Sequence, residues 1–146
     1  MGIWQQDIDL ARVNGWSANT LMEALDIRIT AAGDDWLRGT MPVDQRTHQP
    51  YGLLHGGASV ALAETLGSTA AMLTLDPAQF HVVGLEINAN HVRGVREGIV
   101  TGTAKALHLG RSTQLWEIRI EDERQRLVCV SRLTMAVVPV DVVAPR

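Results

Sequence analysis

The residues best suited to chemistry lie in one stretch of the chain, 47–75. Its second half is rich in Ala and Leu and apolar nearly all round, a composition that predicts a helix buried on every side. Glu64 is the one ionisable residue of that helix, and Ser68 follows at i+4, so the two side chains share a face. Because a buried carboxylate is costly unless it is paired or protonated, a buried helix with a single acid is a candidate site.

A loop leads into this helix and ends in two glycines. Pro50 and Gly52 indicate the loop, because one fixes φ and the other relaxes it. Gly56 and Gly57 come directly before the helix-forming residues. Backbone N–H groups at a helix start are unpaired and carry the positive end of the helix dipole, and glycines let a ligand approach them. The alternative is that both glycines serve only a tight turn.

Composition limits the classes of protein. The 146 residues predict a single domain, 1–146, and the net charge of −3 argues against a general nucleic-acid binder while leaving room for a local basic patch. Cys129 is the only cysteine, so no intrachain disulfide can form and a reducing compartment is expected. Residues 1–12 contain charges and no apolar core, and no run reaches transmembrane length. We expect a cytoplasmic protein that binds neither membrane nor nucleic acid.

The elements that must position the site follow from periodicity and turn residues. We first expect a helix over 10–25, with a break near 14–15 and Asn19 as a candidate cap, and then a hairpin over 27–41. A loop over 42–52 leads to the long helix, which ends at about 75. Four strands follow, over about 82–95, 98–107, 113–121 and 126–139, and then a loose tail over 140–146. In the third of these strands Trp116, Ile118 and Ile120 alternate with charged residues. The spacing predicts an antiparallel meander. An all-round apolar helix suits the inside of a curled sheet of about six strands, an α+β fold.

The chain is identified by resemblance as a member of the hotdog-fold acyl-CoA thioesterases. The resemblance is carried by the segment His-Gln-Pro-Tyr-Gly-Leu-Leu-His-Gly-Gly-Ala (48–58), by Glu64 nine residues after His55, and by the segments 41–44, 84–93 and 107–110. It is strongest to the branch that contains the 1,4-dihydroxy-2-naphthoyl-CoA thioesterase of menaquinone synthesis, the enterobactin-pathway proofreading thioesterase and one type of 4-hydroxybenzoyl-CoA thioesterase. One departure is the last hairpin turn, 122–126, which has no glycine.

The resemblance implies a role for each residue around the helix start. Glu64 is expected to be the catalytic carboxylate, as nucleophile or as the base that activates water, and Ser68 to hold that water. The N–H of Gly56 is the main donor to the thioester carbonyl, with Gln49 and His55 helping to polarise it. From the residues alone, Glu64 could instead pair with an arginine, His55 could cap the helix, and Ser68 could bond back to a carbonyl.

The resemblance also implies where the coenzyme lies. His91 and Arg93, two apart and expected on one face of the strand over 82–95, would lie near the acyl or water end and near the coenzyme A phosphates, respectively. The remaining coenzyme contacts would come from a strand-to-strand loop, namely His108, Gly110, Arg111 and Ser112. Arginine suits phosphate because of its fork of donors. The alternative is a solvated charged loop.

The expected activity is hydrolysis of acyl-CoA thioesters with an aromatic or similarly bulky acyl group, without metal or separate cofactor. The alternatives are a carrier-protein thioesterase, a hotdog dehydratase and a non-catalytic acyl-CoA-binding domain. The binding domain would not need Glu64. No His-Glu-x-x-His or Cys-x-x-Cys occurs, so a zinc site is not expected, and no nucleotide-type phosphate loop is present. We also expect a homo-oligomer, a dimer or a dimer of dimers, because the strand over 82–95 leaves a long edge unpaired.

Overall fold

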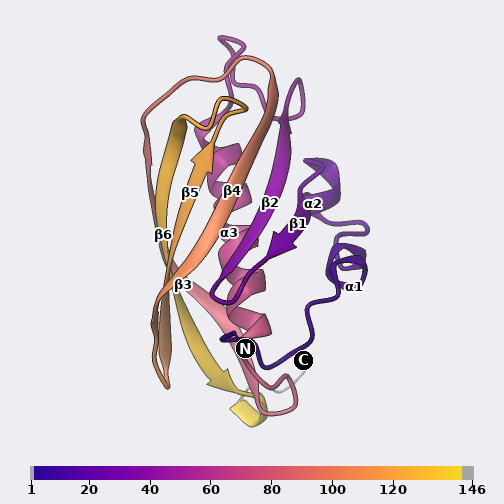
Figure 1. Cartoon of the computed structure of the whole chain (residues 1–146), viewed down its shortest axis with the longest axis vertical. Helices are drawn as coiled ribbons and strands as arrows, with labels where there is room; N and C mark the ends of the chain where they lie inside the picture. Colours follow the sequence, from indigo (N-terminus) through magenta and orange to yellow (C-terminus); the bar gives the residue numbers. More distant parts are fainter. Residues whose placement is uncertain (1, 143–146) are drawn as a thin grey trace.

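The computed structural model describes residues 2–142, and these form one long helix and a six-stranded sheet (Figure 1). The elements are α1 (Leu10–Gly15), α2 (Leu21–Ala24), β1 (Arg28–Ala32), β2 (Trp36–Val43), α3 (Gly56–Leu73), β3 (Phe80–His91), β4 (Gly98–Leu109), β5 (Thr113–Glu121), β6 (Leu127–Pro139) and a short 3-10 helix, η1 (Val140–Val142). The expected α+β fold is confirmed. Residues 140–142 of the expected tail are helical, and 143–146 lie outside the described residues.

The sheet is antiparallel throughout, in the order β1-β2-β4-β5-β6-β3. The predicted meander of the last four strands is therefore wrong for β3, which pairs with β6 at the far edge. The connection over 92–97 does not fold into a hairpin, because its backbone bonds elsewhere. Val92 N–H and Arg93 N–H donate to Val128, while the Val95 carbonyl accepts from Leu54 N–H. β4 consequently pairs with β2 and β5.

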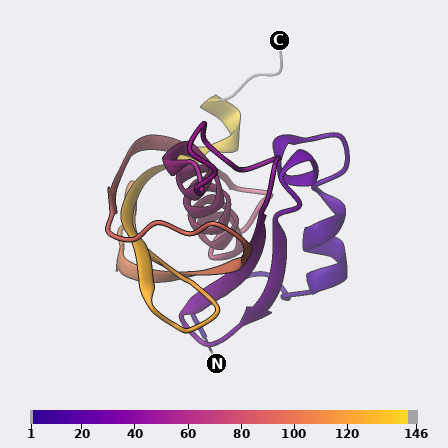
Figure 2. The same ribbon diagram turned by 90° about the horizontal axis from the view of Figure 1, so that it is seen from above.

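The sheet curls around α3, as the view along the helix shows (Figure 2). Small residues allow this close packing: a Cβ at Gly39 or Gly102 would lie 2.7 or 2.6 Å from a methyl group of Leu66. Trp116, Ile118 and Ile120 of β5 point to the helix and are fully buried. Their alternation with charged residues thus identified the inner face correctly.

The helix α3 is not buried on every side, contrary to the expectation from its composition. Leu62, Leu66 and Leu73 face the sheet and are fully buried. One stripe along the opposite side is only half-buried or exposed, and consists of Gly57, Val60, Ala61, Glu64, Thr65, Ser68 and Met72. These positions recur at helical spacing, so they form one face that the sheet of this chain does not cover.

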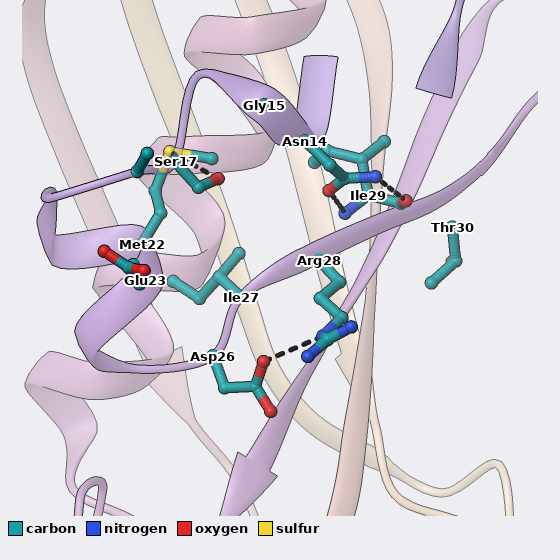
Figure 3. A pocket seen from close by; sticks show the side chains of 11 residues that line it. Asn14, Gly15, Ser17, Met22, Glu23, Asp26, Ile27, Arg28, Ile29 and Thr30 are labelled. Atoms are coloured by element: carbon teal, nitrogen blue, oxygen red, sulfur yellow. Dashed lines mark hydrogen bonds and ion pairs between the residues drawn. The ribbon is translucent and has the colours of Figure 1, made fainter. Parts of the chain in front are cut away.

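The two edges of the sheet differ in how they end. At β1, the side chain of Asn14 accepts from the backbone N–H of Ile29 and donates to its carbonyl, both at 2.8 Å, in the place of a neighbouring strand (Figure 3). The same amide donates to the carbonyl of Leu10, which ties α1 to the edge. At β3, the side away from β6 has no neighbouring strand among the described residues. The β1 edge is therefore blocked, and the β3 edge is open.

Two local expectations need correction, and the glycine-free turn has a structural explanation. The cap of α2 is Thr20, whose hydroxyl accepts from Met22 N–H, while Asn19 adopts a left-handed φ of 61°. β2 includes Pro42 and Val43, which were expected in the loop. In the glycine-free turn over 122–126, Gln125 takes a φ of 60°, and the Asp122 carboxylate accepts from the N–H groups of Arg124 and Arg126. The hydrogen bonds from Arg126 and Arg124 lower the pKa of Asp122.

Candidate active site

The start of α3 is built from the loop and glycines that the sequence indicated. His55 is the N-cap, and its Nδ1 accepts from Gly57 N–H at 2.8 Å. The proton of a neutral ring is then on Nε2, so His55 can still donate to a ligand. The capping alternative for His55 is thus realised, and it leaves a substrate contact open. The N–H of Gly56 has no hydrogen-bond partner within residues 2–142.

A pocket of about 370 Å³ lies beside this helix start. It brings together Gln49, Gly56, His91 and Arg93 from the loop, the helix, the end of β3 and the connection that follows. The imidazole Nε2 of His91 lies 2.9 Å from the position that a Cβ of residue 56 would take. Any larger residue at position 56 would therefore displace His91, which gives Gly56 a reason beyond the turn.

His91 and Arg93 do not share a strand face, because β3 ends at His91. Both nevertheless line the same pocket. Arg93 is exposed and forms no ion pair within the described residues, so its charge is available to an anionic ligand.

Six further residues line this pocket and were not predicted from the sequence: Leu53, Leu54, Ser59, Val92, Gly94 and Val128. Ser59 could have been found, since it lies one turn after Gly56 on the predicted helix. Val128 belongs to β6, and nothing in the sequence brings it to this place.

Glu64 and Ser68 lie farther along the helix, outside this pocket. The Ser68 hydroxyl donates to Glu64 Oε1 at 3.2 Å, and it does not bond back to a carbonyl as Thr65 does. Glu64 Oε1 also lies 2.9 Å from where a Cβ of Gly84 in β3 would be. Glu64 forms no ion pair within the part of the chain that the structure describes. Its carboxylate is thus held by a hydroxyl and not neutralised by a cation of its own chain.

The helix separates Glu64 from Gly56. Eight residues at 1.5 Å of rise each put the two about 12 Å apart along the axis. A single thioester carbonyl that accepts from Gly56 N–H is therefore out of reach of Glu64 from the same chain.

The predicted coenzyme loop lies at the other end of the sheet. Val83 of β3 and Thr113 of β5 are both level with Ala136 of β6. The loop with Arg111 and Ser112 is therefore close to the start of β3, about 30 Å from Arg93, since a strand rises about 3.3 Å per residue. Within one chain the structure does not bring Arg93 together with His108, Gly110, Arg111 and Ser112.

A second hollow, of about 270 Å³, lies on the other side of the helix start. It is lined by His55, Gly57 and Ala61 together with Leu21 and Leu25 from α2 and its C-cap. Arg46, which also lines it, donates to Asp44 and lowers the pKa of that carboxyl to about 2. The charge of Arg46 is thereby compensated locally.

Known proteins share this architecture. The family model of the thioesterase superfamily matches residues 51–129, which include the helix start, Glu64, β3, β4 and β5. The 1,4-dihydroxy-2-naphthoyl-CoA hydrolase of Escherichia coli is 56% identical over 92% of this chain and 98% of its own. The proofreading thioesterase EntH of Cronobacter turicensis is also 56% identical, with the same coverage.

The chain belongs to the thioesterase superfamily.

Solved structures agree with this assignment. A Q49A mutant of thioesterase PA1618 from Pseudomonas aeruginosa superposes on this thioesterase with a TM-score of 0.94, at 52% identity, over 95% of this chain and 100% of the other. Thioesterase HI1161 from Haemophilus influenzae gives a TM-score of 0.91 at 50% identity, over 94% and 95%. The expected hotdog fold and thioester hydrolase activity are therefore confirmed.

The described residues contain neither a membrane-spanning helix nor a cluster of metal ligands. None of the helices within residues 2–142 is long and apolar enough to cross a membrane. The same part of the chain contains no group of His, Cys, Asp and Glu arranged to hold a metal ion.

Proposed function

We propose that this thioesterase hydrolyses acyl-CoA thioesters whose acyl group is aromatic or similarly bulky, in a site formed by two copies of the chain. The observation that carries the proposal is the pocket at the start of α3, where the unbonded N–H of Gly56 lies beside Gln49 and His91. The E. coli relative is named for 1,4-dihydroxy-2-naphthoyl-CoA, so a bicyclic aromatic acyl group and a step of menaquinone synthesis in the cytoplasm are proposed first.

In this mechanism the thioester carbonyl accepts from Gly56 N–H, with Gln49 of the same pocket as a further donor. His55 lines the hollow on the other side of the helix start and is not assigned a contact with this carbonyl. One such donor to the developing oxyanion contributes about 3–4 kcal/mol to lowering the barrier. Glu64 either attacks the carbonyl carbon or takes a proton from the attacking water, which Ser68 helps to hold. If water attacks, the tetrahedral intermediate collapses, the carbon–sulfur bond breaks, and coenzyme A leaves as its thiol with the proton that Glu64 took from water. If Glu64 attacks, coenzyme A leaves as its thiolate, and water then hydrolyses the mixed anhydride on Glu64 to the free acid and supplies the proton that the thiolate takes up. No metal or separate cofactor takes part.

Two copies are proposed because Gly56 and Glu64 lie about 12 Å apart on one helix. The two residues of one chain therefore cannot both contact the same carbonyl. The open edge of β3 is where a second copy fits. β3 also exposes Val83 and Leu85, and the uncovered face of α3 with Glu64 and Ser68 lies next to it. Pairing two β3 strands about a two-fold axis would extend the sheet and bring Glu64 of the partner toward Gly56.

The same pairing accounts for the separated coenzyme residues. Two antiparallel β3 strands put the end of one beside the start of the other. Arg93 of one chain then approaches the partner end that carries His108, Gly110, Arg111 and Ser112. We propose that these residues bind the coenzyme A phosphates from two chains, and that two such dimers form the tetramer.

Release of free thiol from a panel of thioesters tests the proposal. The panel contains 1,4-dihydroxy-2-naphthoyl-CoA, benzoyl-CoA, a long fatty acyl-CoA and an aryl carrier-protein thioester. We expect the aryl-CoA thioesters to give the highest kcat/KM. Binding without thiol release from any of them would identify an acyl-CoA-binding protein. A higher kcat/KM for the carrier-protein thioester would identify the enzyme as a carrier-protein thioesterase. A monomer in light scattering at micromolar concentration would refute the shared site.

A further inference from the structure

His48 is a titratable residue beside the pocket that the mechanism above does not use. It belongs to the loop that ends in His55, and its ring nitrogen Nε2 lies 2.8 Å from the carbonyl oxygen of Arg96. Because a carbonyl can only accept, Nε2 carries the proton in this contact. The bond joins two segments that are 48 residues apart in the chain.

The two joined segments each contribute a wall of the same pocket. Gln49, Leu54 and Gly56 come from the loop side, whereas His91 and Arg93 come from β3 and the connection over 92–97. That connection has no regular secondary structure, so its position depends on individual contacts.

Two hydrogen bonds join the connection to the loop, besides the side chain of Leu53, which lies beside Gly94. The first part of the connection is bound to β6, since Val92 N–H and Arg93 N–H both donate to the Val128 carbonyl. Its second part is bound to the loop, by Leu54 N–H to the Val95 carbonyl at 2.7 Å and by His48 to Arg96. His48 thus supplies the one side-chain hydrogen bond between these two walls within the described residues.

The loop side of the bond is itself fixed without the imidazole. Thr47 is 2% exposed, its hydroxyl donates to the Pro42 carbonyl at 2.8 Å, and its own carbonyl accepts from His55 N–H. The backbone of His48 forms a β-bridge with Leu54. Removing the ring should therefore loosen the second part of the connection, which keeps its bond from Leu54 N–H, while leaving the loop in place.

We infer that His48 is a positioning residue: through the Arg96 carbonyl it sets the separation between the wall with Gln49 and Gly56 and the wall with His91 and Arg93. A displacement of about 1 Å at a reacting site lowers rates by as much as a hundredfold. Since the effect is read through thioester turnover, this assignment rests on the proposed function.

Three variants test it. In His48→Ala the bond is lost, and we expect kcat/KM for benzoyl-CoA to fall about ten- to a hundredfold, with KM raised as well as kcat lowered. In His48→Gln the amide nitrogen lies near the position of Nε2, and we expect most of the activity to return. Gln45→Ala is the matched control, because Gln45 is an exposed neighbour whose side chain makes no hydrogen bond within residues 2–142.

A second measurement separates positioning from global damage. Amide hydrogen exchange should become faster in His48→Ala at residues 92–97 and at Leu54, with the melting temperature and the exchange of β5 unchanged. Equal loss of activity in the Ala and Gln variants, or wild-type kcat/KM in His48→Ala, would overturn the assignment of His48. Absence of thiol release from the wild-type enzyme would instead overturn the proposed function.

Discussion

Glu64 and Ser68 are joined by one hydrogen bond, and Glu64 has no ion-pair partner among the described residues. The serine hydroxyl orients the carboxylate, and no cation of the described chain neutralises it. The hydroxyl of the neighbouring Thr65 donates to the Ala61 carbonyl one turn earlier, as hydroxyls in helices commonly do. The Ser68 hydroxyl instead donates to Glu64, because the carboxylate lies beside it.

The first prediction concerns Glu64. Glu64→Ala and Glu64→Gln should still bind substrate, but their kcat should fall by a factor of at least about 10²–10⁴. This is the usual contribution of a positioned general base. Glu64→Asp should keep part of the activity, because it retains the charge on a shorter side chain. Steady-state kinetics and thermal melting are the measurements. If Glu64 were half of a structural ion pair with a second chain, the Ala variant would lose about 3–5 kcal/mol of stability and retain kcat in its folded fraction.

The second prediction concerns the arginines. Arg93→Ala and Arg111→Ala should raise KM more than they lower kcat, because contacts with the phosphates are about equal in the ground and transition states. Both effects should shrink as salt is added, since exposed charges are screened. Arg119→Ala is the control, because Arg119 is exposed on β5 and lies neither in the pocket with Arg93 nor in the loop with Arg111. Effects on kcat alone in both variants would remove these residues from the coenzyme site.

At the scale of elements, the blocked and open edges decide how the sheet can grow. β1 is short, and α1 delivers Asn14 to both backbone groups of Ile29. β3 is more than twice as long and has no such cover among the described residues. Association through a sheet edge, as proposed above, would therefore use β3, the strand that contains His91 and lies against Glu64 at Gly84.

The third prediction follows from that difference. Asn14→Leu should leave the N–H and carbonyl of Ile29 without partners, at a cost of about 1–3 kcal/mol each in the free energy of unfolding. It should also allow strand pairing at β1, seen as growth beyond the wild-type oligomer in light scattering. Asn14→Asp keeps the acceptor for Ile29 N–H and should fall between the two. A variant with wild-type stability and size would mean that α1 covers this edge without Asn14.

For the whole molecule, the separation of Gly56 and Glu64 on one rigid helix is the decisive property. Wrapping the sheet around α3 fixes the helix, so no local motion can bring the two residues to one carbonyl. The face of α3 that the sheet leaves uncovered contains Glu64. The site proposed above would therefore be complete only in an assembly of two chains.

The fourth prediction tests this by complementation. Gly56→Ala should be inactive, because the new methyl group collides with His91 and shifts the oxyanion donor. Co-expressed in equal amounts with Glu64→Ala, it should yield mixed dimers with one intact site, and about a quarter of wild-type activity overall. Co-expression of Glu64→Ala with Glu64→Gln is the control and should give none. No recovery in the first mixture would mean that each chain works alone.

The sequence by itself determined the elements and the chemical groups. Period-2 alternation placed Trp116, Ile118 and Ile120 on the inner face, and the two glycines with the Ala-rich run placed the start of α3, because these signals depend on neighbours close in the chain. The tertiary structure alone decided the position of β3, since the bond from Leu54 to Val95 that diverts the connection joins distant segments. It also decided that α3 keeps an open face and that Arg93 and Arg111 lie far apart, because strand order and curvature are properties of the closed sheet and not of any one strand.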